Sequence, residues 1–293
     1  MKAKVKRARQ ARRAIRKIFN FLVVIGLVYF AVVWLYPKCL VFYTSYQKFD
    51  TSEVDTYYDL LSKHAKPAKD FVLNLGIKED DNLQLAIDRL KGVMGLGNYK
   101  IWLAHHDAEK PPAYIKDLGY GDMGILISTR VKERREEINL LVHELSHIYV
   151  WRLAPSLFGK CDQEKLVDCS GMFLGLGVLI LNGLTDEFKL LPGEGYETRK
   201  KFFGYLKPEE FGYLLARYCA EHGIAEDAIK PFLGPTGRKY FNIGSSCFKK
   251  SDHQISASAG PVTGIYWCSK CGVSTQIPLS GKIEYAKCPK CGK

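Results

Sequence analysis

The chain of 293 residues has a formal net charge of +12, from 43 lysine and arginine residues against 31 aspartate and glutamate residues. This length suits one medium-sized domain with small appendages. The excess charge belongs to the two ends, because residues 1–17 hold nine bases and no acid, and residues 238–293 hold nine bases and two acids. Residues 18–237 carry 25 bases and 29 acids, which makes nucleic acid an unlikely partner of the central domain.

An uncharged apolar segment follows the basic arm. Residues 18–36 contain no charged side chain, and as a helix they would extend about 28 Å, close to the thickness of the bilayer hydrocarbon. Residues 18–37 are therefore predicted to be a transmembrane anchor, which is retained because no small-x-small cleavage site follows it. The bases of residues 1–17 predict a cytoplasmic amino terminus and place the domain that follows the anchor outside the cytoplasm, in a single-pass protein of the cell membrane.

Residues 50–237 are predicted to form an α+β domain, with a small sheet and several helices around a metal site. The apolar pattern predicts two helices and a strand, at residues 54–73, 82–94 and 99–103. His105 and His106 follow this strand. Because adjacent residues of a strand point to opposite faces, we interpret the pair as surface histidines and not as a metal site.

A zinc-binding motif lies in the next helix. Residues 131–153 have apolar positions at helical spacing, and the apolar run at residues 124–128 predicts a strand that leads into this helix. In zincins such a strand often forms the edge that binds extended substrate. The helix contains His143, Glu144 and His147 in the HExxH pattern. One helical turn separates the histidines, so both imidazoles can bind one Zn²⁺ while Glu144 lies beside the open coordination position.

A catalytic zinc needs a third protein ligand, and the sequence offers two carboxylates for it. Glu164 is the preferred candidate, and Asp168, four residues later, projects from the same helical face. One acid can bind zinc while the other orients a histidine, and Asp168 is assigned to that second role. The alternative to a metal site is that His143 and His147 are two partly buried helix histidines and Glu144 is an ordinary surface acid.

The remaining elements before the carboxyl terminus are mainly helical in the prediction. Residues 172–184 are too short to cross a membrane and are expected to form a buried helix behind the metal. Two further helices are expected, at residues 199–203 and 208–222. Residues 238–262 are assigned to a linker, because small residues, glycine and proline gather toward its end.

Residues 263–293 contain a second metal-binding motif, which consists of cysteines. Two CxxC pairs, separated by sixteen residues, are formed by Cys268, Cys271, Cys288 and Cys291. Four thiolates at this spacing predict a structural zinc in a zinc ribbon, with two short strands at residues 273–277 and 282–285. Two disulfides are the alternative, and a reduced four-cysteine site is commoner in reducing compartments than outside the cell.

The HExxH motif with the later ExxxD motif resembles the gluzincin pattern of the HtpX-like and CAAX-prenyl membrane proteases and, more loosely, of the ImmA/IrrE-type peptidases. The resemblance covers residues 124–183 and implies zinc ligation by His143, His147 and Glu164, with Glu144 as catalytic base. It assigns Asp168 to the second shell. The chain departs from these families in its short His147 to Glu164 separation and in lacking multiple membrane spans.

Two other resemblances bear on the site. Residues 164–183 and 204–210 are similar to a group of bacterial zincins. The SprT-type proteins also join HExxH to a zinc ribbon, but they take a histidine as third ligand soon after the motif. No histidine occurs here between His147 and His222, which favours a carboxylate ligand.

These features predict a membrane-anchored zinc metallopeptidase that holds one catalytic and one structural Zn²⁺ and acts on a peptide or protein substrate. Glu144 would accept a proton from the zinc-bound water. Three tyrosines could stabilise the oxyanion, Tyr149, Tyr196 and Tyr205, and the sequence does not choose among them. The alternative function is a non-catalytic scaffold, in which the zinc ribbon recognises a protein or an anionic polymer.

Overall fold

A computed structural model of the chain describes residues 50–68, 70–107, 111–119, 121–153, 155, 162–191, 195–201, 203–251, 263–279 and 288–292. Residues 49–293 form one compact unit. The described helices are α3 (Ser52–His64), α4 (Gln84–Val93), α5 (Arg134–Leu153), α6 (Gln163–Phe173), α7 (Gly177–Asn182), α8 (Pro208–Glu221), α9 (Glu226–Ile229), η3 (Lys230–Phe232) and α10 (Pro235–Phe248). The strands are β1 (Asp70–Asn74), β2 (Lys100–His106), β3 (Ala113–Gly119), β4 (Asp122–Ser128), β5 (Thr185–Leu191), β6 (Gly195–Lys201), β7 (Thr263–Trp267) and β8 (Ser274–Pro278).

The fold-class prediction requires a correction in its membrane part. Among the described helices, none combines the length and the apolar character needed to cross a bilayer. Helix α5 has 20 residues, but charged side chains such as Arg135 and Glu137 interrupt its apolar positions. The predicted arm at residues 1–17 and the predicted anchor at residues 18–37 lie outside the described residues. The described residues form a mixed α/β fold with no membrane-spanning helix.

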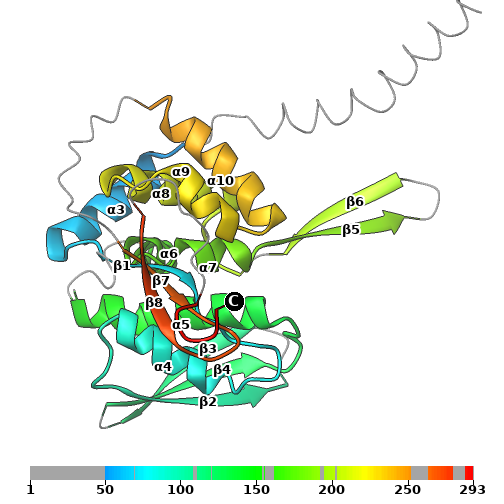
Figure 1. The fold of residues 1–293 in the computed structure, drawn as a ribbon. Helices are drawn as coiled ribbons and strands as arrows, with labels where there is room; N and C mark the ends of the chain where they lie inside the picture. Colours follow the sequence, from blue (N-terminus) through cyan, green and yellow to red (C-terminus); the bar gives the residue numbers. More distant parts are fainter. Residues whose placement is uncertain are drawn as a thin grey trace, which may run out of the picture. The chain divides into compact units, whose positions relative to one another are not determined.

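Helix α5 is the centre of this fold. It packs on β3 and β4 of the sheet β2-β4-β3 and also contacts α4, α6 and α7, so that in Figure 1 it lies between the sheet and a layer of helices. Contacts on several sides explain why buried residues surround the helix axis and include polar ones such as Asn139, Glu144 and Ser146. The polar groups of α5 are therefore held inside the protein.

The predicted strand and helix around the motif are confirmed as β4 and α5. Strand β4 is not a sheet edge, because it pairs with β2 on one side in parallel and with β3 on the other in antiparallel orientation. The edges of this sheet are β2 and β3. The expectation that the strand immediately upstream of the motif helix forms a sheet edge is therefore wrong.

The sheet β1-β7-β8 joins the predicted ribbon, which carries the four cysteines, to the rest of the domain. Strand β7 runs parallel to β1, with Phe71 opposite Gly264, and antiparallel to β8. Residues 70–73 are thus a strand and not the end of the predicted first helix. Three consecutive buried residues, Phe71 to Leu73, show why periodicity misled there: a strand with both faces covered has no apolar alternation.

Two other predictions differ from the structure. Residues 195–201, expected to enter a helix at 199, form β6, which pairs along its length with β5 in a separate two-stranded sheet. Residues 238–248, assigned to the linker, belong to α10, while residues 252–262 lie outside the described residues. The predicted buried helix at 172–184 is divided by a turn after Phe173, and its second part is α7.

Helices α8 and α10 approach each other through two glycines. A Cβ atom built on Gly212 would lie 2.1 Å from the Tyr240 carbonyl oxygen, and one built on Gly244 would lie 2.0 Å from the Tyr213 nitrogen. Backbone atoms cannot move aside as a flexible side chain can. We expect Gly212→Ala to destabilise the fold by about 3 kcal/mol or more, despite the helix propensity of alanine. Chemical denaturation measures this effect, with Gly92→Ala as a control, because Gly92 has open space around it.

Candidate functional site

Helix α5 presents the two motif histidines on one face. The Nε2 atoms of His143 and His147 lie 3.3 Å apart, and their rings meet nearly edge to face. The side chains are 12% and 22% exposed, so both are accessible from one side while the helix backbone is buried. The helical spacing therefore produces the convergence that the motif predicts.

Helix α6 supplies the carboxylate that completes the group. Glu164 Oε2 lies 3.2 Å from His143 Nε2 and 3.3 Å from His147 Nε2. Three ligand atoms bound to zinc at 2.0–2.1 Å in a tetrahedron lie about 3.3 Å from one another. His143, His147 and Glu164 thus form three corners with the spacing that a tetrahedral metal ion requires, and they can hold such an ion.

Asp168 has a different position, behind the first histidine. Its Oδ1 atom lies 2.8 Å from His143 Nδ1, and its Oδ2 atom accepts hydrogen bonds from the backbone N–H groups of Tyr205 and Leu206. The carboxylate is buried, at 5% exposure. A hydrogen bond from Nδ1–H to Asp168 leaves the Nε2 lone pair of His143 directed at the metal position. Glu164, and not Asp168, lies with the two histidines.

The charges of the site are strongly coupled. Burial by itself lowers the pKa of His143, but its hydrogen bonds with Asp168 and Glu164 outweigh burial and raise that pKa to about 10. The same hydrogen bond from His143 lowers the pKa of Glu164. Burial, and then the neighbouring His143, lower the pKa of His147. A divalent cation bound here would replace the proton between His143 and Glu164.

Glu144 occupies a buried position next to this group. Glu144 is only 5% exposed, and this burial raises the pKa of its carboxyl group to about 7. A carboxylate with that pKa can accept a proton near neutral pH and return it. The histidine pair interpreted as a surface pair lies on β2, where His105 is exposed and His106 is partly buried. His106 contacts the Tyr114 ring.

The structure distinguishes among the three tyrosines considered for oxyanion stabilisation. Tyr149 is 6% exposed within the core, and the side chain of Tyr196 lies outside the described structure. Tyr205 is 58% exposed, and its ring stacks on His143 with the centroids 6.0 Å apart. The loop at residues 204–206 also supports Asp168 through its backbone N–H groups, which no local sequence pattern predicts. The similarity of residues 204–210 to bacterial zincins was the only sequence feature that pointed to this loop.

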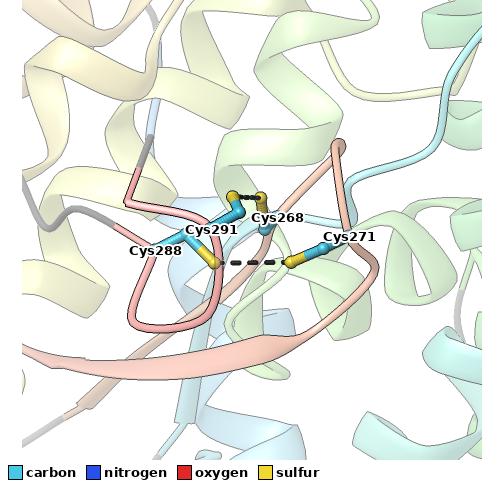
Figure 2. Close-up of side chains that lie close together, drawn as sticks. All are labelled: Cys268, Cys271, Cys288 and Cys291. Atoms are coloured by element: carbon cyan, nitrogen blue, oxygen red, sulfur yellow. Dashed lines mark hydrogen bonds between the residues drawn. The ribbon is translucent and has the colours of Figure 1, made fainter.

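The four cysteines form a second group, shown in Figure 2. Cys268 Sγ lies 3.6 Å from Cys291 Sγ, and Cys271 Sγ lies 3.4 Å from Cys288 Sγ. These distances exclude disulfides, because a disulfide bond is about 2.05 Å long. They approach the ~3.8 Å edge of a tetrahedron with 2.3 Å zinc–sulfur bonds. The four thiols can hold a metal such as zinc.

Both cysteine pairs lie in the same kind of turn. Gly272 has φ 69° and donates its N–H to the Cys268 carbonyl, and Gly292 has φ 68° and donates to the Cys288 carbonyl. Glycine adopts this left-handed conformation without steric cost, which suits the tight turn after each pair. Backbone N–H groups of Cys291 and Lys290 lower the pKa of Cys288 to about 6, which favours the thiolate.

The strands of the ribbon differ in part from the prediction. The predicted strand at residues 273–277 is confirmed as β8, but its partner is β7, which precedes the first cysteine pair. The other predicted strand, at residues 282–285, lies outside the described residues.

Comparison of the chain with protein-family models, with curated proteins and with solved structures gives no match. The two groups that can hold a metal, one of four cysteines and one of two histidines with Glu164, are therefore the basis for inferring a function.

Proposed function

We propose that this chain is a zinc-dependent peptidase of the zincin type, with His143, His147 and Glu164 as ligands of a catalytic zinc. The observation that carries this proposal is the equilateral arrangement of the three ligand atoms, at 3.2–3.3 Å, beside the buried Glu144. A purely structural zinc has four protein ligands, whereas a site with three leaves one position open. A carboxylate base beside an open position is the arrangement that hydrolysis needs.

A bound Zn²⁺ would supply a water of lowered pKa and polarise the peptide carbonyl. The protein residues divide the remaining work. Glu144 accepts a proton from the attacking water and passes it to the leaving amine. Asp168 holds His143 in the tautomer and orientation that ligation requires, and the backbone of residues 205–206 holds Asp168 in turn.

The four-cysteine group has a structural role in this proposal. Four thiolates leave no open position, so a zinc bound by Cys268, Cys271, Cys288 and Cys291 would not contact substrate. Its function is to stabilise the ribbon, whose strand β7 completes the sheet that starts with β1. One catalytic and one structural zinc per chain are therefore expected.

Metal removal tests the proposal. The purified full-length protein is expected to contain two zinc ions per chain, and a chelator is expected to abolish cleavage of a fluorogenic peptide library as the first of them is lost. The histidine group should release zinc first, because its Glu164 side chain is 36% exposed while Cys268 and Cys288 are buried. Added zinc should restore cleavage. A protein that binds zinc at both groups but cleaves no peptide in the library would instead support the scaffold function.

Tyr205 is proposed as the donor to the oxyanion of the transition state. It is the exposed tyrosine whose ring stacks on His143, one of the proposed metal ligands. We expect Tyr205→Phe to lower kcat by about 100-fold and to leave zinc affinity unchanged, because the ring that contacts His143 is kept. Tyr149→Phe is the matched control in the core of α5. An unchanged kcat in Tyr205→Phe would remove this residue from the mechanism.

A further inference from the structure

A small cavity lies directly behind the pair formed by His143 and Asp168. It has a volume of about 10 Å³, and its lining residues come from α5, α6, α7 and α8. Apolar walls come from residues such as Val142 and Ile180, and the polar lining includes Asn139 and Ser146 in addition to the His143–Asp168 pair. A cavity of roughly this size accommodates one water molecule, provided that two or more polar groups face it.

Two of the polar groups in this lining have no hydrogen-bond partner among the described residues. Asn139 Nδ2 and Ser146 Oγ are both buried without one, in residues that are 3% and 0% exposed. A buried polar atom without a partner is costly, so native proteins satisfy such atoms with protein groups or ordered water. Both residues flank His143 on α5, at four residues before it and three after it, and therefore share its side of the helix.

The environment of Asn139 restricts how it can be satisfied. A Cβ atom built on Gly183 would lie 2.5 Å from the Asn139 Cβ, so this glycine is in close contact with the asparagine and limits its movement. The Ser146 hydroxyl group can rotate, and it can donate or accept. An asparagine donor, a serine hydroxyl and the Asp168 carboxylate around one cavity match the bonding capacity of a single water molecule.

We propose that one buried water links Asn139 and Ser146 to Asp168, which makes Asn139 and Ser146 positioning residues for the metal ligand His143. This inference deepens the proposed function, because it assumes that His143 binds the metal. The water would accept from the Asn139 amide and donate toward Ser146 and Asp168. It would thereby hold the carboxylate that orients the imidazole, in addition to the backbone donors of residues 205–206.

Gly171 provides a variant that removes the water and keeps both polar side chains. A Cβ atom at this position would lie 3.5 Å from Ser146 Oγ and 2.9 Å from Ile180 Cδ1, the flexible end of a side chain. The same atom would lie 3.2 Å from Val142 Cγ1, so Gly171→Ala fills the cavity and requires small shifts of the Ile180 and Val142 side chains. Ser146→Ala instead removes one of the partners of the water. Ser170→Ala is the matched control, because Ser170 is equally buried but its hydroxyl group donates to the Val167 carbonyl and is not part of the cavity.

The experiment measures the zinc affinity of the full-length protein by competition with a chromophoric chelator, together with a high-resolution crystal structure. Gly171→Ala and Ser146→Ala are each expected to weaken zinc binding at the histidine group by about 10-fold, and Ser170→Ala to leave it unchanged. The wild-type crystal should contain a water in this cavity that the Gly171→Ala crystal lacks. An empty cavity in the wild-type crystal, or zinc affinities of both cavity variants equal to wild type, would overturn the inference. Failure of the peptidase proposal would appear separately, as wild-type protein that binds zinc without cleaving peptides.

Discussion

Glu144→Gln is expected to lower kcat for peptide cleavage by about 1,000-fold, because glutamine has the shape of glutamate but cannot accept a proton from the attacking water. Zinc content should remain at the wild-type value, since Glu144 is not among the three ligand atoms at 3.2–3.3 Å from one another. Cleavage is measured with the peptide that the wild-type protein cleaves fastest, and bound zinc is measured in the same samples.

The control for this variant is Glu133→Gln. Glu133 precedes α5 and is exposed, where it pairs with Arg135. Its replacement is expected to change neither kcat nor zinc content, because an exposed ion pair contributes little to stability. Peptide cleavage that persists in Glu144→Gln at the wild-type rate would exclude Glu144 as the base, and with it the mechanism proposed for the site.

The second large effect is expected from Cys288→Ser. This change removes one of four thiolates that face each other at 3.4–3.6 Å, and we expect the protein to lose one zinc per chain. The loss should reach the main domain, because β7 of the ribbon is hydrogen-bonded to β1 and helps cover Phe71 and Leu73. The free energy of unfolding is expected to fall by more than about 3 kcal/mol.

Cys247→Ser serves as the control for the ribbon variant. Cys247 lies on α10, is only partly buried and does not belong to the four-cysteine group. It is expected to retain both zinc ions and to change stability by less than about 1 kcal/mol. A Cys288→Ser protein with one zinc fewer but unchanged stability would show that the ribbon and the main domain fold independently, contrary to the shared sheet.

The sequence predicted the grouping of the metal-site residues well where the information is local. In α5 the helical repeat alone brings His143 and His147 together, and in the ribbon each CxxC pair with its glycine specifies one knuckle turn. Local patterns failed at β1 and β6. A buried strand without alternation, such as β1, looks like a helix, and its pairing with the distant strand β7 leaves no periodic signal in the neighbouring residues.

One question about the site, the choice between Glu164 and Asp168, could be answered only by the packing of α6 on α5. Glu164 and Asp168 share a helical face, so their spacing cannot decide which carboxylate meets the histidines. In the fold, Glu164 Oε2 reaches both Nε2 atoms, while the oxygens of Asp168 are taken by His143 Nδ1 and by the backbone at residues 205–206. Which carboxylate reaches both histidines therefore depends on how deeply each residue lies in the interface between α5 and α6.

The sequence by itself therefore determined which residues could bind metal, because those residues are placed by short-range helical and turn geometry. Tertiary structure decided which position each of these residues takes in the site. It assigned Glu164 to the ligand group, Asp168 to the support of His143, and Tyr205 to a position over the same ring. It also made the ribbon part of the domain through β1 and β7. These relations depend on distances between segments far apart in the chain, which packing of a common core sets and local sequence does not encode.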